Sequence, residues 1–134
     1  MPDKELKKII IQWQEWLING RNYSKHTAQS YLNDLNIFLE YFSKEDINLS
    51  MLESLNIRDF RNFFSYRAQK GISKTSIARE ESAIKNFYKW LNNNKTICNT
   101  IIFQISSPRL PKTLPKSVDA NILFDITLLR LQPL

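Results

Sequence analysis

Two short segments of this sequence combine hydroxyl and lysine side chains in a way that suits phosphate binding. The first is Ser24-Lys-His-Thr27, and Ser73-Lys-Thr-Ser76 repeats it 49 residues later. A serine favours the N-cap of a helix, and the first amides of a helix together with a lysine attract anions. The repeat therefore predicts two positively polarised helix starts that face phosphates.

The helix expected to follow Ser73 has a polar face without acids. On a helical wheel, apolar residues from Ile77 to Leu91 fall on one arc. The opposite arc holds Thr75, Arg79, Ser82, Lys85, Asn86 and Lys89. An α-helix fits the major groove of DNA, where Arg or Lys can read guanine and Asn can read adenine. An ordinary solvated basic face is the alternative interpretation of this pattern.

Residue types that could perform catalysis are sparse. His26 is the only histidine and Cys98 the only cysteine, which excludes an internal disulfide and argues against a metal site. Glu80 and Glu81 are adjacent, so on a helix they point about 100° apart and cannot share a substrate proton. We expect no metal, no cofactor and no small-molecule substrate.

Apolar residues recur at helical spacing in four stretches, which predicts an all-α fold. Ser24, Asn56 and Ser73 are the expected N-caps, and Gly20 and Gly71 the expected helix ends. Residues 43–55 are interpreted as a polar connection, and residues 97–105 as a short helix or an extended segment. The four predicted helices cover residues 3–19, 24–42, 56–71 and 73–92.

The charge of the chain is positive and unevenly distributed. The net charge is +6 over 134 residues; residues 1–50 contribute −1 and residues 51–134 contribute +7. Basic residues beside an aromatic-rich helical pattern favour a nucleic-acid partner, with simple solubility as the alternative. The N-terminus lacks a signal-peptide pattern and no apolar stretch reaches ~18 residues, so we expect a cytoplasmic protein without a membrane partner.

A basic, proline-rich segment follows the helices. Pro108, Pro111 and Pro115 exclude a helix and predict a stiff, extended linker over residues 106–117. The helical domain is accordingly expected to cover residues 1–105.

Three segments resemble tyrosine recombinases of the XerC/XerD type, with the XerC type the closer match. They are the run from Tyr23 through Asp34 and Leu35 to Phe38, the run from Gly71 to Leu91, and the linker Ser107-Pro-Arg-Leu-Pro-Lys112 with Leu114-Pro-Lys116. The resemblance implies a four-helix, SAM-like core-binding domain. In this family, two crossed helix pairs form half of a clamp around a recombination half-site.

The resemblance also implies which residues contact double-stranded DNA. The second and fourth predicted helices face the major groove, and the linker follows the DNA backbone. The candidate contacts are Lys25, His26, Thr27, Ser30, Asn33, Lys74, Thr75, Arg79, Ser82, Lys85, Lys89, Arg109, Lys112 and Lys116.

The sequence departs from the family pattern at its C-terminal end. The family's catalytic tyrosine, arginines, lysine and histidines lie in a second domain, and residues 118–134 match only its truncated start. Nothing after Lys116 is His, Tyr or Lys, and Arg130 is the only basic residue there. We therefore expect that the chain cannot cleave or rejoin DNA by itself. A shortened gene product and a fragment with a separate catalytic partner both fit this pattern.

The implied function is binding of a dif-like half-site in DNA integration, recombination and chromosome dimer resolution, with a recombinase of the XerD type as partner. The alternative is a protein-interaction module or non-functional recombinase remnant that pairs with such a partner through Val118–Leu134. On the DNA-binding hypothesis, Lys85→Ala and Lys89→Ala should weaken binding without lowering the melting temperature.

The repeat also exposes one mismatch. Glu81 stands where the first copy has Leu32, and it lies in an apolar stripe with Ile77, Ile84 and Tyr88. A buried carboxylate would cost about 1–3 kcal/mol unless it reached towards Lys85. Glu81→Leu is therefore predicted to raise the melting temperature.

Overall fold

The computed structural model describes residues 2–43 and 46–105 of the chain. These residues form an all-α fold, as predicted, with no strand among them. The α-helices are α1 (Lys4–Glu15), α2 (Lys25–Tyr41), α3 (Leu49–Ser54), α4 (Ile57–Gln69) and α5 (Lys74–Asn93). A π-helical turn, η1 (Trp16–Gly20), extends α1, and a 3-10 turn, η2 (Ile101–Gln104), follows α5.

The three predicted N-caps are confirmed. Ser24 accepts a hydrogen bond from the Thr27 amide at 3.0 Å, and Ser73 accepts one from the Ser76 amide at 3.1 Å. Asn56 forms a capping box with Asp59, in which each side chain accepts from the other residue's amide. Each cap satisfies an amide that the helix leaves without a carbonyl, so these helix starts are determined by local sequence.

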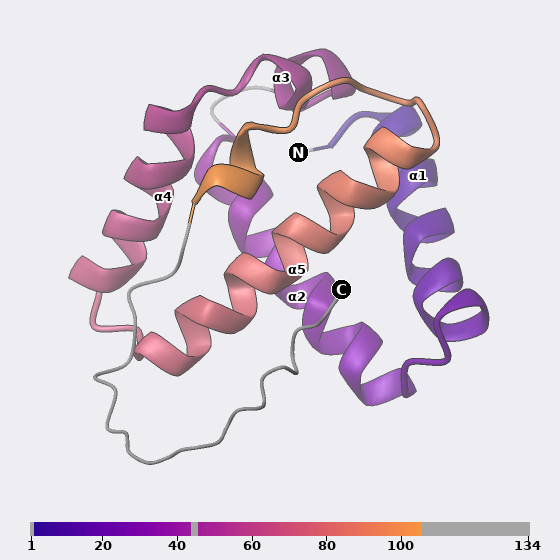
Figure 1. Ribbon diagram of the computed structural model, residues 1–134, viewed down its shortest axis with the longest axis horizontal. Helices are drawn as coiled ribbons and strands as arrows, with labels where there is room; N and C mark the ends of the chain where they lie inside the picture. The colour runs from indigo at the N-terminus through magenta and orange to yellow at the C-terminus, as the bar shows by residue number, and fades with distance from the viewer. Residues whose placement is uncertain (1, 44–45, 106–134) are drawn as a thin grey trace.

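Helices α2 and α5 cross each other at the centre of the domain, with α1 beside them on one side and α4 on the other (Figure 1). Trp13 attaches α1 to α5: its indole packs edge-on against Phe87 at 5.0 Å, and its Nε1 donates to Asn86 Oδ1 at 2.9 Å. Phe38 of α2 stacks on Phe60 of α4 with ring centroids 6.0 Å apart.

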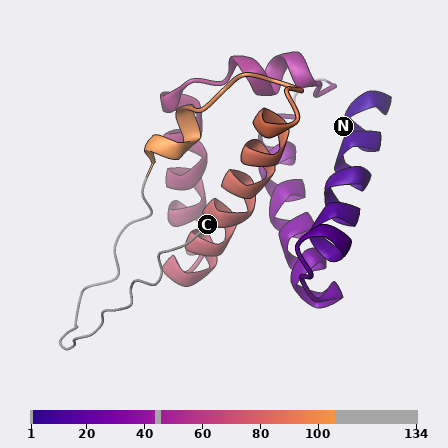
Figure 2. The same cartoon turned by 45° about the vertical axis from the view of Figure 1, so that its right-hand side comes forward.

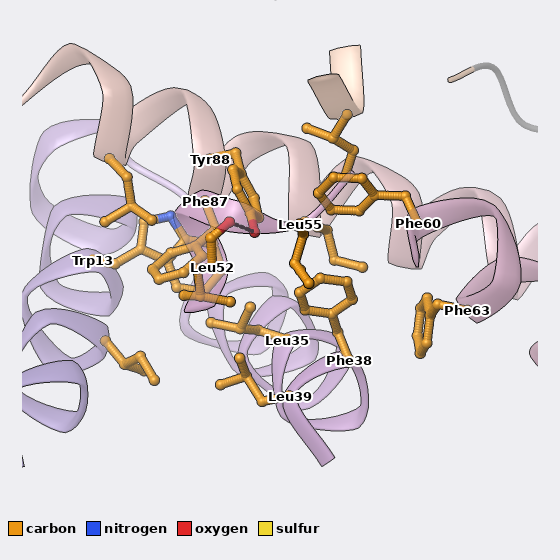
Figure 3. Packing of buried hydrophobic residues seen from close by; sticks show 14 of the residues in the cluster. Trp13, Leu35, Phe38, Leu39, Leu52, Leu55, Phe60, Phe63, Phe87 and Tyr88 are labelled. Carbon is orange, nitrogen blue, oxygen red and sulfur yellow. Dashed lines mark hydrogen bonds between the residues drawn. The ribbon is translucent and has the colours of Figure 1, made fainter. Parts of the chain in front are cut away.

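The core is dominated by aromatic rings (Figure 3). Trp13, Phe38, Phe60, Phe63, Phe87 and Tyr88 are among its largest fully buried side chains. The buried Tyr88 hydroxyl donates a hydrogen bond to the Leu52 carbonyl at 2.8 Å. This contact joins α3 to the C-terminal half of α5, because burying an unpaired hydroxyl would be unfavourable.

Helix α3 was not predicted, and the interpretation of residues 43–55 as a connection without a helix was wrong. Asn48 caps α3 by accepting from the Met51 amide at 2.9 Å, and Leu52 is fully buried. With only six residues, α3 is too short to show a helical repeat, and Leu52 is its buried residue.

The two glycines behave differently. Gly71 has a φ of +87°, which confirms it as the residue that ends α4 in a left-handed conformation. The chain instead stays helical through Gly20, and Asn22 takes the left-handed conformation with a φ of 58°. A Cβ atom at Gly20 would lie 2.7 Å from Trp16 Cδ1, so close packing on the indole explains this glycine.

No helix in the described part of the chain is long and apolar enough to cross a membrane. The predicted linker at 106–117 and the segment 118–134 lie outside the described residues.

Candidate nucleic-acid interface

The two copies of the sequence repeat form equivalent helix starts. In both, the cap serine accepts from the amide three residues later, and its hydroxyl also donates to that residue's hydroxyl, at 3.0 Å to Thr27 and 3.1 Å to Ser76. The starts of α2 and α5 lie at the same side of the molecule, the lower side in Figures 1 and 2. Two polarised helix ends therefore lie at one side of the domain.

Most predicted contact residues within the described range are exposed on these two helices. On α2, Ser30 is half-buried, while on α5 Lys85 is half-buried. The remaining candidates are exposed: Lys25, His26, Thr27 and Asn33 on α2, and Lys74, Thr75, Arg79, Ser82 and Lys89 on α5. Arg109, Lys112 and Lys116 lie outside the described residues.

Arg79 joins the two helices through a bidentate ion pair. Its Nε donates to Asp34 Oδ2 at 2.9 Å, and its Nη2 donates to Asp34 Oδ1 at 2.8 Å. These hydrogen bonds raise the pKa of the Arg79 guanidinium, although partial desolvation opposes them. Asp34 is fully buried, so the pair satisfies an acid that would otherwise be isolated inside the domain.

The two acids of α5 are also withdrawn from its surface. Glu80 is buried and accepts two hydrogen bonds from Arg67 of α4, at 2.9 and 2.7 Å. Glu81 is buried and its carboxylate lies 2.6 Å from the Lys85 ammonium. The burial of Glu81 and its reach towards Lys85 agree with the analysis of the repeat. The exposed face of α5 is thus left with basic and neutral polar side chains, which favours a polyanionic partner.

Lys85 is placed differently from the other candidates. Its ammonium donates to the Ile105 carbonyl as well as to Glu81. Because removing this ammonium would leave Glu81 buried without a counter-ion, Lys85→Ala should lower the melting temperature. The expectation that this substitution would leave the melting temperature unchanged is therefore revised.

Arg21 is a basic residue of this surface that the sequence patterns did not reveal. Its guanidinium lies over the rings of Trp16 and Tyr23, at 5.7 and 5.6 Å from their centroids, just before the start of α2. Stacking on two rings restricts the side chain while leaving its N–H groups available. The only sequence signal for this contact was the spacing of Arg21 from Trp16, five residues before it, and Tyr23, two residues after it. That spacing brings the three side chains together only because the chain turns here.

Across residues 2–43 and 46–105, no group of three or more His, Cys, Asp or Glu side chains could hold a metal ion.

Comparison with known proteins agrees with this geometry. Residues 10–95 match the family model described as phage integrase, N-terminal SAM-like domain. This match includes all of α2 to α5 and the second half of α1. No solved structure shows significant similarity to the chain.

Several curated relatives are tyrosine recombinases named XerC. The protein of Rickettsia bellii (strain OSU 85-389) is 38% identical over 131 residues, which cover 93% of this chain and 43% of that protein. Those of Rickettsia canadensis and Rickettsia prowazekii are each 39% identical over 124 residues, covering 90% of this chain and 41% of the relative. The chain therefore spans about two fifths of the length of these relatives.

Proposed function

Because the chain belongs to the family of phage integrase N-terminal SAM-like domains, and is similar to the N-terminal part of XerC tyrosine recombinases, we propose that it binds double-stranded DNA with a sequence preference. In this proposal the starts of α2 and α5 contact phosphates and the exposed face of α5 enters the major groove. The observation that carries the proposal is the placement of two capped, lysine-bearing helix starts at the same side of the domain (Figure 1).

The electrostatics of the two helices support a DNA partner. Asp34, Glu80 and Glu81 are all buried and ion-paired, so they do not oppose a phosphate at the surface. Lys25 and Lys74 follow the cap serines and are exposed, next to amides that carry the positive end of the helix dipole. Such positions are suited to hold the protein on the DNA backbone, while side chains further along α5 contact bases.

The biological setting is part of the same proposal. We propose that the chain acts as the DNA-binding part of a XerC-like recombinase, in DNA integration, recombination and chromosome dimer resolution. A dif-like half-site is its proposed target and a recombinase of the XerD type its proposed partner. The expectation that the chain cannot cleave or rejoin DNA by itself stays a prediction.

The decisive experiment is a mobility-shift titration of the full chain over a series of salt concentrations. A duplex carrying a dif-like half-site is compared with a scrambled duplex of the same length and composition. We expect tighter binding to the half-site and a steep loss of affinity with salt. Each phosphate contact should contribute about 0.9 to the slope of log K against log salt.

Matched substitutions test which part of the surface binds. Lys25→Gln and Lys74→Gln should each reduce the salt slope by about one contact and weaken binding to both duplexes. Lys95→Gln is the control, because this exposed lysine follows the opposite end of α5. Equal affinity for the two duplexes would refute the sequence preference, and no binding at low salt would refute the DNA-binding function itself.

A further inference from the structure

The Asp34–Arg79 ion pair has an asymmetry that a purely structural brace does not need. Asp34 is 0% exposed, whereas the Arg79 side chain is 50% exposed. The domain contains a comparison in Arg67 and Glu80, which form the same two-point contact through Nε and Nη2 with exposed fractions of 11% and 1%. Arg67 and Glu80 are therefore both enclosed, whereas in the other pair Asp34 is enclosed and Arg79 is not.

The geometry of the Arg79 contact leaves one edge of its guanidinium free. Asp34 uses the edge formed by Nε and Nη2, at 2.9 and 2.8 Å. A guanidinium carries five N–H donors in a rigid fork, so the Nη1 groups and the second Nη2 hydrogen are not used by Asp34. This remaining end has two parallel N–H groups, the arrangement with which arginine binds O6 and N7 of guanine in the major groove.

The position of Arg79 suits base contact better than backbone contact. It lies more than one turn into α5, beyond the Ser73 cap and Lys74, which are placed at the phosphate-facing helix start. It is also held to α2 through Asp34, so its orientation depends on both helices that form the proposed surface. A buried carboxylate that fixes an exposed arginine reduces the side-chain entropy lost when the arginine binds.

We propose that Arg79 is a specificity-determining residue that reads one guanine of the target, and that Asp34 is the residue that positions it. This inference rests on the proposed DNA-binding function and adds to it a base identity and a mechanism. Lysine at position 79 would keep the positive charge but could not present two parallel donors, because an ammonium is a point charge.

The test is a selection of duplexes with randomised positions by the full-length chain, followed by affinity measurement at every position of the selected site. Wild type, Arg79→Lys and Asp34→Asn are compared. For wild type we expect a guanine preference of about 5- to 150-fold at one position. Arg79→Lys should abolish this preference, Asp34→Asn should weaken it, and the preferences at the other positions should remain.

Two controls separate base reading from general effects. Lys74→Gln removes the exposed cation that is proposed to contact a phosphate at the start of α5, and it should lower affinity for all duplexes without changing the guanine preference. Arg67→Lys disturbs the enclosed ion pair and should lower thermal stability while the selected sequence stays the same. Circular dichroism melting curves define a temperature at which every compared variant is folded.

The outcomes distinguish this inference from the proposed function. If wild type selects a sequence and Arg79→Lys retains the full guanine preference, Arg79 is a structural brace and the inference is wrong. A uniform loss of affinity across all duplexes would make Arg79 a phosphate contact and would also overturn it. If Asp34→Asn does not fold, the Arg79→Lys variant tests the inference by itself. That variant keeps Asp34 and places a lysine ammonium near it, so the buried acid is not left without a cation. Absence of any duplex binding by wild type would refute the proposed function as well.

Discussion

The Lys85 ammonium lies 2.6 Å from the Glu81 carboxylate one helical turn away and also donates to the Ile105 carbonyl. Glu81 is 6% exposed, and the side chain of Lys85 is 28% exposed. The lysine thus neutralises a carboxylate in the apolar face of α5 and attaches the last described residue, Ile105, to the same helix. A basic residue that looked like a DNA contact in the sequence has a stabilising role.

Substitutions at this pair should not be additive. Lys85→Ala is expected to reduce the free energy of unfolding by about 1–3 kcal/mol, because it leaves Glu81 buried without a partner. Glu81→Leu is expected to raise stability by a similar amount, since leucine suits the apolar stripe and Lys85 can reach water. In the Glu81→Leu background, Lys85→Ala should cost only the hydrogen bond to the Ile105 carbonyl, about 0.5–1.5 kcal/mol. Urea denaturation of the four proteins measures this cycle. A loss of stability in Glu81→Leu would show that the ion pair outweighs the buried leucine.

Removing Glu80 should be among the most destabilising single changes in the domain. Its carboxylate is 1% exposed and holds Arg67 of α4 against α5. Glu80→Ala would leave the Arg67 guanidinium enclosed without its acid, which costs about 3–5 kcal/mol in comparable buried pairs. Glu15→Ala is the matched control, because Glu15 is exposed at the end of α1 and should change stability by less than about 0.5 kcal/mol. A loss below about 1 kcal/mol for Glu80→Ala would mean that the helices hold together without this pair.

Tyr88 should make stability sensitive to alkaline pH. Burial raises the pKa of its phenol well above the ordinary value, so the folded protein keeps the proton at pH values where the unfolded chain loses it. Stability then falls as pH rises above about 10, by up to about 1.4 kcal/mol per pH unit. Tyr88→Phe lacks this term.

At pH 7, Tyr88→Phe should be less stable than wild type by about 1 kcal/mol, the typical value of one hydrogen bond. The cost is limited because the Leu52 carbonyl keeps a second donor, Asn99 Nδ2 at 3.2 Å. By about pH 11 the difference between the two proteins should disappear. Denaturation curves at pH 7, 9 and 11 measure it, and a constant difference across this range would contradict the role of Tyr88.

Arg21 should contribute to DNA affinity but little to sequence preference. Its guanidinium is exposed and stacked on Trp16 and Tyr23, beside the start of α2. Arg21→Gln is expected to weaken binding to specific and scrambled duplexes alike and to lower the salt slope by about one contact. Arg21→Lys should retain most of the affinity, because lysine keeps the charge. A salt slope identical to wild type in Arg21→Gln would remove Arg21 from the interface.

Features that depend on neighbours along the chain could be predicted from the residue pattern alone. The helical class and the caps at Ser24, Asn56 and Ser73 follow from spacings of three and four residues, which a helix brings together wherever it is placed. The apolar stripe around Glu81 and the i+4 spacing of Lys85 were visible for the same reason, whereas the burial of Glu81 is a finding of the structure.

The pairing of polar residues across the domain could not be predicted from the residue pattern, because it depends on how the helices pack. Asp34 and Arg79 are 45 residues apart, and Arg67 and Glu80 are on different helices, so both contacts depend on how α2, α4 and α5 pack. The short helix α3 and the stacked Arg21 depend on packing in the same way. On a helical wheel, Lys85 and Arg79 were equivalent members of one polar arc. In the fold, Lys85 contacts Ile105 while Arg79 contacts Asp34 of α2, so the two residues have different roles. A helical wheel cannot show this difference, because it gives only the direction of each side chain around one helix axis and not the residues of other elements that it meets.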